Sequence, residues 1–256
     1  MTSTTPLEGT AALVTGASSG IGEATAVALA ERGAAVALIA RRQDRLEQLA
    51  GRIDGDGARA VPIQADLTDA GQARDAVART VSELGRLDIL INNAGVMLLG
   101  PVQDAPLEEW ERMLDVNLNG LLYCAHAALP HLIRAAEDGP RGVADMVNLS
   151  SVAGRVVRNG SGVYNLTKFG VGAFSESLRQ ELAGRHVRVS LIEPGATATE
   201  LQSHNRPEIR DGIRQRFADI ERLESEDIAE AIAFMVTRPR RAAVNELMIR
   251  PSEQAD

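Results

Sequence analysis

Short apolar segments alternate along this chain with longer segments in which apolar residues recur at helical spacing. The apolar segments carry few polar residues on either face, which is typical of strands buried on both sides in a parallel sheet. We expect strands at 11–16, 34–40, 58–66, 87–95, 145–151, 187–195 and 245–251. Helical periodicity marks 20–33, 42–53, 70–85, 106–135 (as one segment or two), 162–184 and 225–237.

This alternation predicts an α/β fold with a Rossmann-like doubly wound parallel sheet of about seven strands and helices on both faces. No repeat, low-complexity tract or linker divides residues 1–256, so we expect a single domain. Two segments depart from the pattern. Residues 135–142 (AAEDGPRG) are predicted to be a polar loop, and residues 196–223, where the sheet needs no element, are predicted to be a substrate lid.

The composition of the 256 residues, 45% hydrophobic and 24% charged, is ordinary for a globular protein. A net charge of −8 without a basic stripe argues against nucleic acid as a partner. The first residues lack the basic and apolar features of a signal peptide, and no apolar stretch approaches membrane-spanning length. We therefore expect a cytoplasmic protein without a membrane partner.

Metal and disulfide chemistry are not expected. The single cysteine, Cys124, excludes an internal disulfide and lies in a helical pattern, so a buried structural thiol is predicted. The four histidines are scattered without metal-ligand spacing.

A glycine-rich turn, TGASSGIG, joins the first strand to the first helix. Gly16, Gly20 and Gly22 let the backbone approach a pyrophosphate, whose charge the helix N-terminus attracts. The alternative is a plain glycine turn, but the strand–turn–helix context favours nucleotide binding.

The same letters also satisfy G-x-S-x-G, the nucleophile elbow of serine hydrolases, with Ser18 as the nucleophile. This hydrolase alternative is disfavoured. The elbow would lie on the first strand, and neither His186 nor His204 lies clearly at a strand end.

The end of the second expected strand bears on the choice of cofactor. NAD enzymes of this fold carry an acidic residue there, whereas NADP enzymes leave room and supply an arginine. Here the position falls at Ala40, and Arg41 and Arg42 follow directly, while Asp44 lies too far into the helix. The two arginines could be solvated helix starters, but a helix N-terminus is unfavourable for cations. We therefore predict NADP(H), with Arg41 as the main contact of its 2′-phosphate.

Tyr164 and Lys168 are four residues apart and so share one face of an expected helix. Taken alone, such a pair is more typical of a solvated helix surface than of a catalytic site.

The ordered set of TGASSGIG, NNAG (92–95), Asn117, the serines at 150–151, YNLTK and PG (194–195) resembles the short-chain dehydrogenase/reductase family over nearly the whole chain. Longer strings such as NNAGVMLLGPVQDA, FSESLRQEL and the terminal IRP resemble the branch that includes clavulanic acid dehydrogenase and related NADP-dependent hydroxy-acid dehydrogenases. The segment at 135–142 looks longer than in that branch.

The resemblance implies an NADPH-dependent oxidoreductase that reversibly reduces an aldehyde or ketone. It implies four catalytic residues: Asn117, Ser151, Tyr164 and Lys168. Ser151, thirteen residues before Tyr164, hydrogen-bonds the carbonyl oxygen, and Tyr164 donates the proton. Lys168 and the oxidised nicotinamide are expected to lower the pKa of Tyr164 from its usual value near 10. Asn117 is implied to hold a water in a relay to Lys168, or else to be a helix-interior amide that bonds only to backbone.

The resemblance also implies where the cofactor binds. Asp66 is expected at the adenine edge, unless it is only a helix N-cap. The implied contacts are Gly16, Ser18, Ser19, Gly20, Ile21, Gly22, Arg41, Arg42, Asp66, Leu67, Asn93, Ala94, Gly95, Tyr164, Lys168, Pro194, Gly195, Thr197 and Thr199. A non-catalytic dinucleotide sensor is disfavoured because all four catalytic positions are intact.

A homotetramer is implied, with contacts through 106–135, 162–184 and the C-terminal strand region. The apolar residues Leu121, Leu122, Val171 and Phe174 fit such a contact or the core equally well. The substrate, a small carbonyl or alcohol compound, is not readable from the sequence. An apolar pocket wall is suggested by Met97, Leu98, Leu99, Val156 and Val157. A carboxylate could be met by Arg155, Arg158 and His204.

Overall fold

The computed structural model describes residues 5–255. Its strands form one seven-stranded sheet in the order β3-β2-β1-β4-β5-β6-β7, and every neighbouring pair is parallel. The strands are β1 (Ala11–Thr15), β2 (Ala35–Ala40), β3 (Ala60–Gln64), β4 (Ile89–Asn92), β5 (Ala144–Leu149), β6 (Val187–Pro194) and β7 (Glu246–Ile249). The predicted single-domain, doubly wound α/β fold is confirmed.

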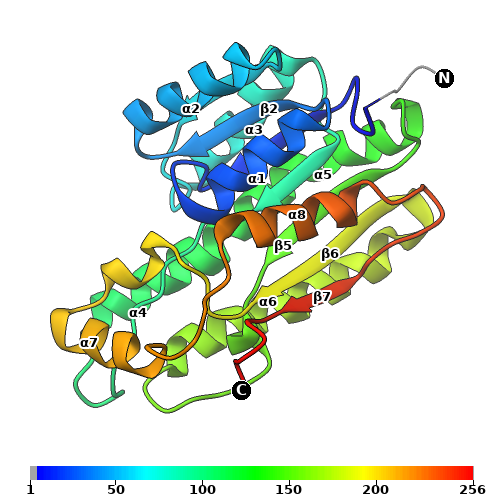
Figure 1. The fold of residues 1–256 in the computed structure, drawn as a ribbon. Helices are drawn as coiled ribbons and strands as arrows, with labels where there is room; N and C mark the ends of the chain where they lie inside the picture. Colours follow the sequence, from blue (N-terminus) through cyan, green and yellow to red (C-terminus); the bar gives the residue numbers. More distant parts are fainter. Residues whose placement is uncertain (1–4, 256) are drawn as a thin grey trace.

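Helices cover both faces of this sheet (Figure 1). The helices are α1 (Gly20–Glu31), α2 (Gln43–Gly55), α3 (Ala70–Leu84), α4 (Leu107–Leu114), α5 (Gly120–Asp138), α6 (Gly162–Leu182), α7 (Pro207–Arg216) and α8 (Ser225–Val236). Helices α1, α2 and α8 pack on one face, and α3, α5 and α6 pack on the other. Within residues 5–255, no helix combines the length and hydropathy needed to cross a membrane.

Two-sided burial follows from the alternation of side chains along each strand. In β1, Ala12 and Val14 face the layer of α1, whereas Leu13 faces the layer of α3 and α5. The chain order reverses between β1 and β4, so the carboxyl ends of these strands border a crevice at the switch point.

The segment after α4 corrects one expectation. A π-helical turn, Asp115–Asn119, joins α4 to α5, so 107–138 is one continuous helical run. Helix α5 continues to Asp138, and the predicted loop at 135–142 is therefore wrong for its first four residues. Ala135 and Ala136 are buried against the sheet layer, which holds the last turn of the helix in place despite the polar residues that follow.

Residues 196–223 form no strand of the sheet, as expected. They contain a short 3₁₀ turn, Glu200–His204, and α7, whose N-cap residue Arg206 pairs with Glu109 of α4 at 3.2 Å. The two ends of the segment meet in a parallel bridge between Thr197 and Leu223. The N–H of Leu223 donates to the carbonyl of Ala196 at 3.0 Å, and the N–H of Ala198 donates to that of Leu223 at 2.8 Å.

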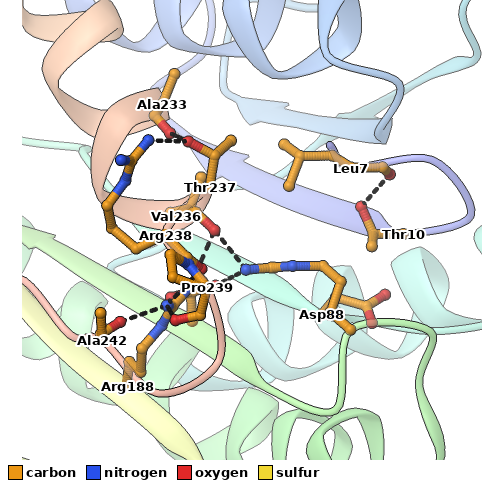
Figure 2. A network of polar contacts seen from close by, with 12 residues as sticks. Leu7, Thr10, Asp88, Arg188, Ala233, Val236, Thr237, Arg238, Pro239 and Ala242 are labelled. Atoms are coloured by element: carbon orange, nitrogen blue, oxygen red, sulfur yellow. Dashed lines mark hydrogen bonds and ion pairs between the residues drawn. The ribbon is translucent and has the colours of Figure 1, made fainter. Parts of the chain in front are cut away.

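A buried ion pair joins β5 to β6 at the end of the sheet opposite the crevice. Asp145 and Arg188 are direct register partners, and both oxygens of Asp145 accept hydrogen bonds from Arg188, at 2.7 and 2.9 Å. Figure 2 shows the Arg188 side chain at the C-terminal end of α8, where it donates to the carbonyls of Val236, Arg238 and Ala242. A cation at this place satisfies backbone acceptors that a helix end leaves without partners.

Candidate active site

A cavity of about 470 Å³ opens at the carboxyl ends of the strands, under residues 196–223. This volume lies within the range of small-molecule sites. Of the predicted site residues, all line the cavity except Gly22 and Asn117, which lie behind its wall. The fold thus brings together residues that span most of the sequence.

Two glycines of the glycine-rich turn lie where a side chain would not fit. Gly16 has a φ of +66°, and a Cβ there would lie 2.9 Å from the Cα of Ala94. A Cβ on Gly22 would lie 2.4 Å from both the carbonyl oxygen of Gly16 and the side-chain nitrogen Nδ2 of Asn93. At Gly16 the turn therefore presents bare backbone to the cavity, which allows the close approach of a pyrophosphate.

Thr15 and Asn93 brace this turn. The Thr15 hydroxyl accepts hydrogen bonds from the N–H groups of Asn93 and Ala94 at 2.9 and 3.0 Å. The Asn93 amide donates to the carbonyls of Thr15 and Gly16 at 2.8 and 3.3 Å. The Asn93 side chain thus holds the turn against β4, and its place among the cofactor contacts stays a prediction. Sequence reasoning missed Thr15, since a threonine at a strand end carries no signal of its own.

Arg42 lies across the serines of the turn. Its guanidinium donates to the Ser18 hydroxyl at 2.9 Å and to the Ser19 hydroxyl at 2.7 Å. A hydrolase would need a base on Ser18, and an arginine cannot take its proton. The contacts of Ser18 therefore oppose the hydrolase alternative and place a cation where a phosphate group could bind.

The end of β2 has the predicted character. Ala40 is buried and lines the cavity, so no acid stands at the position used by NAD enzymes. Arg41 also lines the cavity, but its side chain is exposed and its carbonyl accepts from Gln64. Arg42 also lines the cavity, so Arg41 as the main phosphate contact stays a prediction.

Asp66 lines the cavity and is not a helix N-cap, because Asp69 caps α3 by accepting from the N–H of Gln72. The Asp66 carboxylate instead accepts from the N–H and hydroxyl of Thr68 at 3.1 and 2.8 Å. The alternative of a cap is wrong, and the adenine-edge role stays a prediction.

Tyr164 and Lys168 lie in the first turns of α6, and both are buried, at 6% and 7% exposure. The alternative of a solvated surface pair is therefore wrong. Lys168 is the only lysine in the chain. Its ammonium donates to the carbonyl of Leu149 at 2.9 Å and lies 5.8 Å from the centre of the Tyr164 ring.

Burial dominates the titration of both groups. It raises the pKa of Tyr164 to about 12, although a hydrogen bond with Ser151 partly opposes the shift. It lowers the pKa of Lys168 to about 8. The lowered Tyr164 pKa predicted from the sequence relies on Lys168 and the charge of the oxidised nicotinamide. Burial acts in the opposite direction, because it removes the water that would stabilise a phenolate.

Ser150 and Ser151 both line the cavity, but their hydroxyls have different partners. The Ser150 hydroxyl is buried and donates to the carbonyl of Lys168 at 3.0 Å, so it ties β5 to α6. Ser151 lines the cavity, where its side chain accepts from the N–H of Ala153 and hydrogen-bonds Tyr164.

Asn117 lies in the π-helical turn between α4 and α5. Its amide exchanges two hydrogen bonds with the backbone of Val96, at 2.8 and 2.9 Å, and donates to the Thr167 hydroxyl at 3.1 Å. The side chain thus joins the loop after β4 to α6, and does more than the predicted alternative of bonding only to backbone. Its place in a water relay stays a prediction.

The loop after β6 is held from the C-terminal segment. Gln254 accepts from the N–H of Ala196 at 2.8 Å, and a Cβ on Gly195 would lie 2.5 Å from the same oxygen. Thr197 donates to the carbonyl of Gly195, and Thr199 lies against Gly20 of the glycine-rich turn. Sequence reasoning missed Gln254, which lies 58 residues beyond its partner.

The far end of the cavity is apolar with a cationic rim. Met97, Leu99 and Val156 line it as expected, but Leu98 is buried against Met113 and Tyr164 outside the lining, and Val157 is exposed to solvent. Arg155 does not line it, because its guanidinium is held by Glu193 at 2.8 Å. The lining also includes Arg158, His204, Arg216 and Phe217.

A parallel α/β sheet with a glycine-rich turn at its switch point, and a large cavity beside it, defines a dinucleotide-binding enzyme. Residues 10–210 match the family model described as short chain dehydrogenase. The chain therefore belongs to the short-chain dehydrogenase/reductase family of oxidoreductases.

Individual relatives agree with this assignment. The chain is 41% identical to glycine betaine reductase ATRR of Emericella nidulans over 97% of its own length, but spans only 19% of that protein. It is 38% identical to an uncharacterised oxidoreductase of Staphylococcus saprophyticus, with 95% of this chain and 96% of that one covered. The closed form of serine dehydrogenase complexed with NADP+ superimposes with a TM-score of 0.87, at 33% identity over 96% of each chain.

Proposed function

We propose that the protein is an NADPH-dependent reductase that converts an aldehyde or ketone to an alcohol, reversibly, with Tyr164 as the proton donor. The observation that carries the proposal is a buried phenol beside a buried amine, both facing one cavity with Ser151. The bound cofactor supplies the hydride. The residues of the chain then have to bind the carbonyl compound, orient it and deliver a proton.

The protonation states fit this division of work. Because the pKa of Tyr164 is about 12, the phenol is protonated at neutral pH and is ready to donate. Ser151 is neutral and can hydrogen-bond the carbonyl oxygen without competing for the proton. Lys168 is held at the end of β5, from which it can reach the ribose hydroxyls, and Asn117 is proposed to position a water behind it.

NADPH is proposed to be strongly preferred over NADH. The support is the small Ala40 at the end of β2 together with the Arg42 guanidinium on Ser18 and Ser19. A forked guanidinium suits a phosphate by charge and by geometry.

The proposed substrate is a small carboxylated carbonyl compound, and residues 196–223 are its proposed lid. Arg158 is at the cavity rim beside an apolar wall, and the glycine betaine and serine named for two relatives both carry carboxylates. Burial lowers the pKa of His204, so this residue would contribute a hydrogen bond rather than charge at neutral pH. Asn205 docks the lid by accepting from the N–H of Leu99 at 2.7 Å.

A cytoplasmic homotetramer is also proposed. Leu121 and Val171 belong to the core, but Leu122, Leu166 and Phe169 expose apolar surface on α5 and α6. Met248 on the edge strand β7 does the same at the proposed second contact. A monomeric mass by light scattering at micromolar protein would contradict the assembly.

The proposed reaction is tested by NADPH oxidation with matched carboxylated and neutral aldehydes and ketones. Tyr164→Phe should lose nearly all turnover and still bind NADP+, because it removes the proton donor and little else. Tyr123→Phe, which changes the other tyrosine, should keep its turnover. Retained activity in Tyr164→Phe would refute the role, and tight NADP+ binding without turnover on any carbonyl would favour the sensor. Esterase activity lost in Ser18→Ala would revive the hydrolase.

A further inference from the structure

We propose that Glu200 is an internal competitor of the 2′-phosphate of NADP(H), and that exchange of one for the other releases the first turn of the lid. The inference rests on the proposed NADPH preference and adds a specificity-determining residue that lies outside the glycine-rich turn and the end of β2. It concerns a carboxylate on the lid, 158 residues away in sequence from the arginine it contacts.

One guanidinium joins the lid to the glycine-rich turn. Arg42 donates from one nitrogen to a Glu200 oxygen at 2.9 Å, while its other nitrogens donate to Ser18 and Ser19. The second Glu200 oxygen accepts from Arg45 at 2.8 Å. Glu200 and Arg42 line the cavity together with Ala40.

Glu200 is an anion under all conditions of interest. Hydrogen bonds from Arg45, and then from Arg42, hold its pKa at about 2. The contact is therefore always charged, and acidification within the physiological range does not open it.

A 2′-phosphate beside Ala40 would require the same donors. Its oxygens suit the Arg42 fork and the hydroxyls of Ser18 and Ser19. A carboxylate at hydrogen-bond distance from Arg42 would then face a second anion, and such like-charge contacts are unfavourable. One anion must leave, and Glu200 can move because it is partly exposed and begins the short turn Glu200–His204.

Release would move the lid but not its base. The bridge between Thr197 and Leu223 fixes both ends of the segment and does not involve Glu200. NAD carries a hydroxyl in place of the phosphate, so it neither needs the whole Arg42 fork nor repels Glu200. The contact between Glu200 and Arg42 therefore makes the release of the first lid turn depend on whether NADP(H) or NAD(H) binds.

Calorimetric titration of the protein with NADP+, NAD+ and adenosine 2′,5′-bisphosphate tests the proposal. Glu200→Gln should tighten both 2′-phosphate ligands about three- to tenfold, which matches the loss of two partly exposed ion pairs. NAD+ affinity should change less than about twofold. Glu208→Gln is the matched control, because Glu208 is an exposed lid acid that contacts Arg206 instead. It should change none of the three affinities.

Hydrogen exchange gives a readout of the lid itself. NADP+ should increase hydrogen exchange in residues 200–204 of the unmodified protein, and NAD+ should not. Without ligand, these residues should exchange faster in Glu200→Gln than in the unmodified protein. Unchanged or weaker NADP+ binding in Glu200→Gln would overturn the proposal, as would equal tightening of NAD+. If the unmodified protein binds NAD+ as tightly as NADP+, the proposed cofactor preference is wrong. If the unmodified protein prefers NADP+ and Glu200→Gln binds NADP+ with the same affinity, only the proposed competition by Glu200 is wrong.

Discussion

Lys168 donates its ammonium hydrogen bond to the carbonyl of Leu149, the last residue of β5, at 2.9 Å. Since Lys168 lies on α6, the contact fixes the amine at the point where β5 reaches the cavity. The amine is nevertheless buried, and burial lowers its pKa from 10.5 to about 8. Function and stability therefore make opposite demands on this residue.

Lys168→Met should abolish activity and stabilise the protein without cofactor at neutral pH. Below about pH 8 the folded state must bury an ammonium, and this penalty disappears as pH rises from 8 to 10.5, where the unfolded chain also loses its proton. The shift corresponds to about 3 kcal/mol, of which the lost hydrogen bond to Leu149 offsets about 1. Thermal unfolding should show a gain of about 2 kcal/mol at pH 7 that shrinks toward pH 10.

The same lysine allows a direct measurement. Because it is the only lysine, ¹³C-methylation labels one ε-amine besides the terminal amine, and its NMR titration should have a midpoint near 8. A midpoint at or above 10.5 would show that the amine is solvated and would remove the expected stabilisation.

Tyr164 should titrate differently with and without cofactor. In a Tyr123→Phe background it is the only tyrosine, so the tyrosinate absorbance reports it alone. Without cofactor the midpoint should lie near pH 12, and NADP+ should lower it, because the nicotinamide charge favours the phenolate. Oxidation of an alcohol should accordingly accelerate as pH rises. A midpoint that NADP+ leaves unchanged would contradict this account.

Gly22→Ala should disrupt cofactor binding. Its Cβ would lie 2.4 Å from the carbonyl of Gly16, so the glycine-rich turn must shift. Gly51→Ala in α2 is the matched control, since a Cβ built there meets, among residues 5–255, no atom within 4 Å beyond its chain neighbours and its own helix backbone. The control should raise stability by roughly 0.5–1 kcal/mol and leave NADP+ affinity unchanged. Equal NADP+ affinity in the two variants would mean that the turn does not hold the cofactor.

The two arginines after β2 can be ranked by paired switches. Ala40→Asp with Arg41→Ala, and Ala40→Asp with Arg42→Ala, both add repulsion to a 2′-phosphate and remove one attraction. The contacts to Ser18 and Ser19 predict that the Arg42 pair shifts the ratio of kcat/KM further toward NADH. The reverse order would restore the ranking predicted from the sequence.

The fold was predictable because buried parallel strands need continuous apolar runs, and the catalytic positions because their types and spacing recur together. Contacts between segments that are distant in sequence produce no comparable pattern in the sequence. Neither the approach of Glu200 to Arg42 nor that of Gln254 to Ala196 follows from local pattern. The end of α5 was misjudged for a related reason, because polar residues after Ala135 suggested a loop while packing on the sheet kept the helix.

Arg188→Met should destabilise the protein without changing its KM values. The pair with Asp145 is almost fully buried, at 6% and 3% side-chain exposure, and removal of one partner from such a pair usually costs about 3–5 kcal/mol. The loss of stability should be about 3 kcal/mol, at the low end of this range, because Arg141 still donates to Asp145 at 2.8 Å. Arg179→Met removes an exposed pair with Glu176 on α6 and should cost less than about 1 kcal/mol. Urea unfolding of both variants, with KM for NADPH measured alongside, checks the difference; equal losses of stability would show that burial does not set the strength of the Arg188 pair.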